Sequence, residues 1–159
     1  MLEVKQVTLP AFSVVGYKIE ATVEQFESGF GKEMYHSLLR RKEEIRNRSS
    51  EHTLLMQIYP DAVDFNPKTD SFIHMLCYEV STINAVPEGM ASHYVQENTY
   101  ANCIHIGLET ELDQTYEYLY SEWMIESNNE PAEYDFEVWG SRYKPESAEN
   151  EIGIFIALK

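Results

Sequence analysis

The chain has 159 residues, of which 43% are hydrophobic and 13% aromatic, and this composition indicates one globular domain spanning residues 1–159. An excess of 27 acidic over 12 basic residues gives a formal charge of −15, which repels phosphate backbones and anionic headgroups and argues against direct nucleic-acid or membrane binding. Cys77 and Cys103 lie in apolar runs typical of reduced thiols, and neither a signal peptide nor a membrane span is present. We therefore expect a cytoplasmic protein.

The first half of the chain predicts strands around one helix. The Val/Thr/Ile alternation of residues 4–23 indicates two short strands or one bent strand, because Pro10 and Gly16 interrupt it. Apolar residues at helical spacing predict a helix from Phe26 to about Arg48. Two further strand-like runs, residues 53–60 and 71–80, follow it on either side of a turn-rich segment.

The second half predicts the same order of elements. After the Pro/Gly-containing joint of residues 86–92, a strand pair is predicted over residues 93–109 and a helix over residues 111–127. Two strands follow at residues 134–140 and 151–159. The sequence therefore predicts a duplicated α+β fold, with pseudo-repeats of about 1–82 and 87–159.

One local match supports the duplication. "LLMQIYP" (residues 54–60) aligns with "YDFEVWG" (residues 134–140) without a gap, so that Gln57 corresponds to Glu137 and Tyr59 to Trp139. A match this short also arises by chance, so it leaves the duplication open.

Within "YDFEVWG", the alternation of a strand places Asp135, Glu137 and Trp139 on one face and Phe136 and Val138 on the other. We expect the apolar pair to meet the helices. Glu137 is then either a surface acid on the solvent face, or a carboxylate in a groove where Gln57 and Tyr59 lie opposite it. In a groove, it would orient a bound amine, cation or hydrogen-bond donor.

Four segments resemble the GyrI-like domains, the effector-binding domains of AraC-type and MerR-type multidrug regulators. They are "PEGM" (87–90), "YANCIHIG" (100–107), "TYEYLYSEW" (115–123) and "FEVW" (136–139). The last resembles the Phe-Glu-x-Tyr strand of that family, whose glutamate lies at the centre of the ligand pocket. Glu137 matches that glutamate, whereas Trp139 stands where a tyrosine is usual.

The resemblance implies two strand-helix-strand-strand units whose antiparallel sheets form a central cleft for amphipathic, often cationic or planar aromatic compounds. It implies that Glu137 binds the ligand. Together with the groove interpretation, we expect a ligand site at Glu137, Trp139, Tyr59, Gln57, Tyr100 and Trp123, although Trp123 is also explained as helix core. The regulators carry a DNA-binding domain before this one, and here the first strand begins close to Met1. We therefore expect a standalone form.

Three functions remain open. The first is a small-molecule binding protein with Glu137 as the counter-charge. The second is a hydrolase of reactive cyclopropane-bearing DNA-alkylating compounds, in which Glu137 is catalytic and activates a water. The third is a protein partner role like that of the gyrase-inhibiting member of the family, since an acidic surface can imitate DNA.

The sequence indicates no metal and no cofactor. His93, Cys103 and His105 lack the paired spacing of a structural zinc site, so packing explains them better. Neither a phosphate-binding glycine loop nor a G-x-S-x-G elbow occurs. The acidic residues from Glu117 to Glu137 are explained by a solvated surface.

Overall fold

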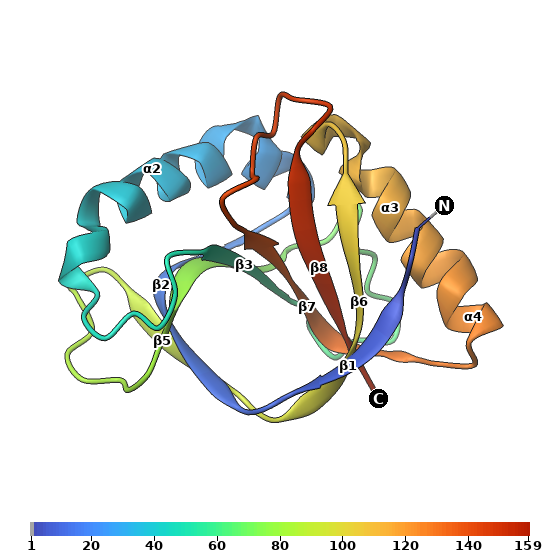
Figure 1. The fold of residues 1–159 in the computed structure, drawn as a ribbon, viewed down its shortest axis with the longest axis horizontal. Coiled ribbons are helices and arrows are strands. Elements are labelled where there is room, and N and C mark those ends of the chain that lie inside the picture. Colours follow the sequence, from blue (N-terminus) through green and yellow to red (C-terminus); the bar gives the residue numbers. More distant parts are fainter. Residues whose placement is uncertain (1) are drawn as a thin grey trace.

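A computed structural model describes residues 2–159, which form one antiparallel sheet with helices on one side (Figure 1). The eight strands are β1 (Lys5–Leu9), β2 (Phe12–Ala21), β3 (Thr53–Ile58), β4 (Phe72–Val80), β5 (Ala91–Val95), β6 (Asn98–Ile106), β7 (Pro131–Trp139) and β8 (Glu151–Leu158). This confirms the predicted fold class, and each strand-helix-strand-strand unit is preceded by one more short strand, β1 or β5.

The order of strands in the sheet is symmetric. It runs β1-β6-β8-β7-β3-β4-β2-β5, and it reads the same from the other end when β1–β4 are exchanged for β5–β8. At the centre β3 lies antiparallel to β7, with Met56 opposite Phe136. This arrangement agrees with the predicted duplication, while the bounds of the pseudo-repeats, about 1–82 and 87–159, stay a prediction.

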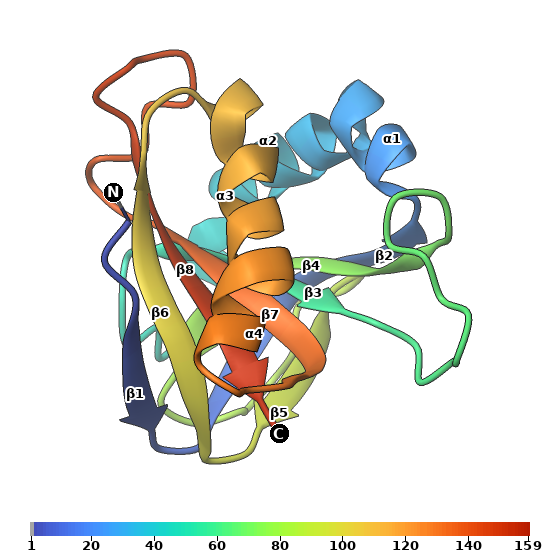
Figure 2. The same cartoon turned by 90° about the vertical axis from the view of Figure 1, so that its right-hand side faces the viewer.

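The helical segments interrupt each half at the same place. The first comprises α1 (Val23–Gln25), a π-helical stretch (Phe26–Phe30), α2 (Gly31–Arg41) and a 3-10 turn (Lys42–Glu44). The second comprises a 3-10 turn (Glu109–Glu111), α3 (Leu112–Tyr118), a π-helical stretch (Leu119–Trp123) and α4 (Met124–Glu126). Figure 2 shows that both lie above the same face of the sheet.

The limits of the first helix follow from local chemistry. Thr22 caps its start, because its hydroxyl accepts from the Gln25 N–H and the Gln25 side chain accepts from the Thr22 N–H. The helix was predicted to reach about Arg48, but it ends at Arg41, since Ile45 is already extended and buried. The Arg48 guanidinium donates to the carbonyl oxygens of Lys42 and Ile45, which supplies donors to the backbone acceptors at this end.

The sheet buries side chains on both faces. On the helix face, Leu38 of α2 and Leu119 pack with Leu55, Leu76 and strand residues of β8. On the opposite face, a second cluster contains Val14, Met56, Met75, Tyr100 and Phe136. A sheet that is covered on both sides needs apolar residues at successive positions, as β3 and β4 have.

One expectation about β7 was wrong. Phe136 and Val138 do not meet the helices but pack in the second cluster, beside Phe155. Trp139 packs in the cluster that contains the helices, and alternation places Asp135 and Glu137 on that same face. The polar face of β7 is therefore the one under the helices. Its carboxylates can be buried there because side chains of neighbouring elements donate hydrogen bonds to them.

The other residues weighed from sequence have structural surroundings. Cys77 and Cys103 are both buried and are not bonded to each other, and the reduced state stays a prediction. His105 hydrogen-bonds through its two ring nitrogens to the Thr115 hydroxyl and the Leu108 carbonyl. Among residues 2–159, no helix is long and apolar enough to cross a membrane, and no cluster of three metal-ligating side chains occurs.

Gly16 tests how tightly the sheet is packed. It lies in β2 between Cys77 of β4 and Ala91 of β5, and a Cβ at this position would collide with the Leu76 carbonyl oxygen and lie 2.5 Å from the Cα of Cys77. Because backbone cannot yield easily, Gly16→Ala should destabilise the fold by about 1–3 kcal/mol in urea unfolding. The control is Gly153→Ala in β8, whose Cβ would meet Val138 at an ordinary 3.5 Å. Equal unfolding midpoints for the two variants would contradict the tight packing at Gly16.

Candidate functional site

Two carboxylates lie side by side under the helices. Asp135 and Glu137 are two residues apart on β7, so their Cα atoms are about 6.6 Å apart. The exposed fraction is 0% for Asp135 and 3% for Glu137. Acidic side chains are almost never buried this fully without partners, so the groups that surround them decide what the site can do.

Glu137 accepts two hydrogen bonds from aromatic side chains. The Tyr116 hydroxyl of α3 donates to its Oε2 at 2.7 Å, and the Trp139 indole N–H donates to its Oε1 at 2.9 Å. Burial, together with the charge of Asp135, raises the pKa of Glu137 to about 7, although both hydrogen bonds oppose this. Glu137 therefore titrates near neutral pH.

Asp135 is a functional candidate that the sequence analysis did not select. Its Oδ2 accepts from the hydroxyls of Tyr59 at 2.7 Å and Tyr120 at 2.6 Å, and its Oδ1 accepts from the Gln57 amide at 2.6 Å. Burial raises its pKa to about 6 against these three bonds. The available signal was the alternation of β7, which places Asp135 on the face of Glu137.

One chain of hydrogen bonds joins the two carboxylates. The Gln57 amide nitrogen, which donates to Asp135, also donates to the Tyr116 hydroxyl at 3.3 Å, and that hydroxyl donates to Glu137. Burial and the neighbouring carboxylates raise the pKa of Tyr116 well above its ordinary value. Tyr116 therefore stays protonated and remains a donor at neutral pH.

Aromatic rings pack on the Trp139 indole, which donates to Glu137. Tyr143, from the connection between β7 and β8, stacks on Trp139 with ring centres 4.5 Å apart, and Tyr35 of α2 meets the same indole edge-on at 5.1 Å. The Tyr143 hydroxyl donates to Glu109 at 2.7 Å, which ties this connection to the start of the second helical segment. In Figure 1 the connection passes between the two helices.

The structure brings together four of the six residues named from sequence. Gln57, Tyr59, Glu137 and Trp139 lie on the helix face and join one network. Tyr100 lies elsewhere, since it packs in the cluster on the opposite face of the sheet and bonds to the Tyr134 hydroxyl. Trp123 is half-buried against the helix-face cluster and makes no hydrogen bond to either carboxylate in the described residues.

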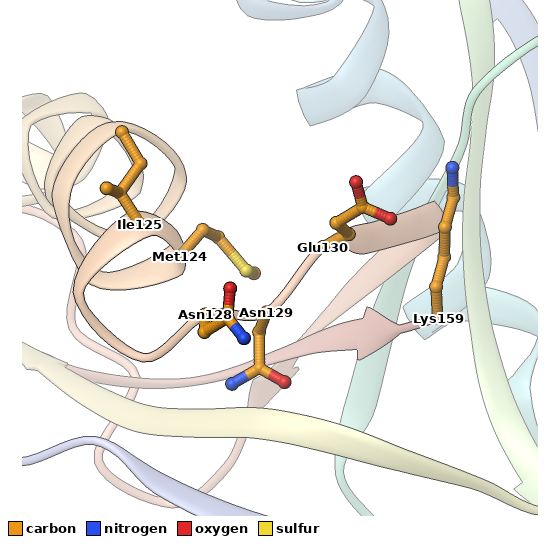
Figure 3. A pocket seen from close by; sticks show the side chains of 6 residues that line it. All are labelled: Met124, Ile125, Asn128, Asn129, Glu130 and Lys159. Atoms are coloured by element: carbon orange, nitrogen blue, oxygen red, sulfur yellow. The ribbon is translucent and has the colours of Figure 1, made fainter.

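A separate surface depression lies at the far end of the second helical segment. It has a volume of about 560 Å³ and is lined by Met124, Ile125, Asn128, Asn129, Glu130 and Lys159 (Figure 3). Neither carboxylate of the helix-face network lines it. Its lining is polar and open, unlike the apolar, enclosed surroundings usual for ligand sites, so we place the candidate site at Glu137.

Comparison with known families and structures gives a consistent result. The sequence model of the GyrI-like small molecule binding domain matches residues 2–159. No curated protein sequence matches significantly. The family match therefore spans all the residues that the structure describes.

Three solved structures are similar in fold. SAV2435 bound to tetraphenylphosphonium has a TM-score of 0.75 at 14% identity, over 99% of this chain and 94% of that one. The EcmrR–DNA complex has a TM-score of 0.75 at 15% sequence identity, and the match covers 99% of this chain and 57% of that one. A hydrolase encoded by lin2189 from Listeria innocua has a TM-score of 0.58 at 6% sequence identity, and the match covers 99% of this chain and 92% of that one.

The buried charge of Glu137 predicts an inverted pH dependence of stability. Its folded pKa, about 7, exceeds the ordinary 4.5, so the folded state holds the proton more tightly than the unfolded state. The free energy of unfolding should therefore fall as pH rises from 4.5 to about 7, by at most on the order of 3 kcal/mol. Thermal melts should show that Glu137→Gln raises the melting temperature at neutral pH and flattens this dependence.

The control for this prediction is Glu133→Gln, which removes an exposed acid from the same strand. Its pH dependence should match that of wild type. Identical melting temperatures for Glu137→Gln and wild type at both acid and neutral pH would show that Glu137 has no desolvation penalty.

Proposed function

Because this chain belongs to the GyrI-like small-molecule-binding family, we propose that it binds amphipathic cations or planar aromatic compounds in the cytoplasm, with Glu137 as the counter-charge. Such a protein acts as the effector-binding part of a multidrug response. The tetraphenylphosphonium bound to SAV2435 is a lipophilic cation, and EcmrR forms a complex with DNA. Both likenesses support this proposal by analogy only.

The observation that carries the proposal is a buried anion that lacks a cation. Among residues 2–159, none of the ion pairs formed by Lys or Arg includes Glu137. Its partners, Tyr116 and Trp139, are neutral donors. A cation that enters the site would regain the electrostatic energy that burial of the carboxylate costs.

The aromatic rings that pack on the Trp139 indole suit the same class of ligand. Tyr35, Trp139 and Tyr143 present π faces and edges around Glu137, and such rings attract cations and stack on planar aromatic groups. Since they already pack on one another, a ligand can replace one ring-to-ring contact by a ring-to-ligand contact. The net charge of −15 further favours the approach of cations over anions.

A second function, hydrolysis of cyclopropane-bearing alkylating compounds, is favoured by the pKa of Glu137. A carboxylate with a pKa of about 7 is a suitable general base at neutral pH. Glu137 would take a proton from water as the water oxygen bonds to the ring carbon. The electron pair of the broken ring bond would move to a carbonyl oxygen conjugated with the ring, where the Tyr116 hydroxyl would donate a hydrogen bond, and the proton that Glu137 took from water would then pass to this oxygen.

Binding is tested by titrating tetraphenylphosphonium into the protein by calorimetry. Wild type should bind it, and Glu137→Gln should weaken binding at least tenfold, because a neutral amide leaves the phosphonium without a counter-charge. Glu133→Gln, which changes the net charge equally, should bind like wild type. Unchanged affinity in Glu137→Gln would remove the carboxylate from the proposed function.

Hydrolysis is tested by incubating the protein with a cyclopropane-bearing alkylating compound and following water addition by mass spectrometry. If the protein is an enzyme, the rate should rise with pH through about 7 as Glu137 loses its proton, and it should vanish in Glu137→Gln. Retained binding without turnover would leave the binding function alone.

A further inference from the structure

We propose that Asp135 is a second ligand-binding carboxylate, which makes the site selective for compounds that carry two positive centres over compounds that carry one. This inference rests on the proposed binding function and specifies its ligand class. Asp135 faces the same side of β7 as Glu137 and is fully buried, yet a single counter-charge role for Glu137 leaves it unexplained.

The surroundings of the two carboxylates contain donors but no compensating charge. Five side chains donate to them, and all are neutral: Gln57, Tyr59, Tyr116, Tyr120 and Trp139. In the part of the chain that the structure describes, no Lys, Arg or His forms an ion pair with either. The next ionisable neighbour, Glu109 behind Tyr143, is itself acidic. Two positive charges would therefore balance this site better than one.

The donors also allow a ligand to replace them. All three hydrogen bonds described to the Asp135 carboxylate come from rotatable side chains, the phenols of Tyr59 and Tyr120 and the amide of Gln57. A phenol displaced from a carboxylate can still present its ring to the incoming cation. The site thus exchanges hydrogen bonds from neutral donors for ion pairs in which both partners carry a charge.

The chain of hydrogen bonds couples the two positions. Gln57 donates both to Asp135 and to Tyr116, and Tyr116 donates to Glu137. A cation that displaces the donor of one carboxylate therefore also disturbs a hydrogen bond of the other carboxylate. A ligand that engages both carboxylates at once avoids leaving one of them with fewer donors. The geometry therefore favours one bivalent compound over two separate monocations.

The spacing defines the ligand. Since the Cα atoms of Asp135 and Glu137 are about 6.6 Å apart, two ammonium or amidinium groups should be separated by roughly 7 Å. Tyr116 and Tyr120 donate to Glu137 and Asp135 respectively, and their rings are stacked with centres 6.4 Å apart, which favours a flat aromatic spacer in the ligand. A benzene ring with an aminomethyl group at each para position has this arrangement.

The experiment compares para-xylylenediamine with para-methylbenzylamine, which have the same ring and differ by one charge. Calorimetry on the full chain at neutral pH should show the diamine binding wild type at least tenfold more tightly. Asp135→Asn should reduce this ratio below threefold, mainly by weakening the diamine. Glu137→Gln should reduce it as well, so the proposal remains testable if Asp135→Asn does not fold.

A matched control separates charge from local structure. Tyr120→Phe removes one donor to Asp135 but keeps its carboxylate, so the preference for the diamine should persist in this variant. Loss of the preference in Tyr120→Phe to the same extent as in Asp135→Asn would assign Asp135 a merely structural role and overturn the proposal.

Two other outcomes are distinguishable. If wild type binds tetraphenylphosphonium but binds the two amines equally or not at all, the second carboxylate has no role in selection and only this inference fails. If wild type binds none of the three compounds, the proposed binding function fails and this inference fails with it.

Discussion

The desolvation of two acids on β7 is the constraint that organises the centre of this molecule. A buried carboxylate must receive hydrogen bonds or lose its charge, and Asp135 and Glu137 receive them from separate sets of donors. At an effective dielectric constant of about 20 and a separation of about 7 Å, two such charges also repel each other by roughly 2–3 kcal/mol. Natural proteins keep such costs where function needs them.

The donors come from both halves of the chain, and this links the site to the fold. Gln57 and Tyr59 belong to the first half, while Tyr116 and Tyr120 belong to the helical segment of the second half. The network therefore exists only when β3 and β7 lie side by side at the centre of the sheet. The proposed binding site and the packing of the two halves therefore share the same contacts.

Much of the fold was readable from the sequence, because hydrophobic periodicity and turn residues determine elements locally. The helix predicted over 111–127 and the central strands were found as expected. The first helix was predicted too long because its end depends on the Arg48 side chain and on burial of Ile45, which are tertiary features. Alternation likewise separated the faces of β7 correctly but could not say which face the helices cover.

The site was predictable only in part for the same reason. Glu137, Trp139, Gln57 and Tyr59 were found together, since one strand pattern and one aligned strand placed them. Tyr100 looked equivalent in sequence, yet its position in β6 directs it to the other face. The partners of Asp135 come from two segments far apart in the chain, the end of β3 with the residue after it and the second helical segment, so no local pattern shows the whole set.

The first strand of each half pairs with a strand of the other half, and this pairing affects how the molecule assembles. β1 pairs with β6 and β5 pairs with β2, so the opening strand of each half completes the sheet of the other. A polypeptide of residues 1–82 alone would leave β1 without a neighbour and would expose the backbone edges of β2 and β3. Two copies of such a fragment can satisfy these edges mutually, as in a domain-swapped dimer. The intact chain carries out that reciprocal pairing within one molecule. Because the two halves are covalently linked, each first half always has one second half with which to pair.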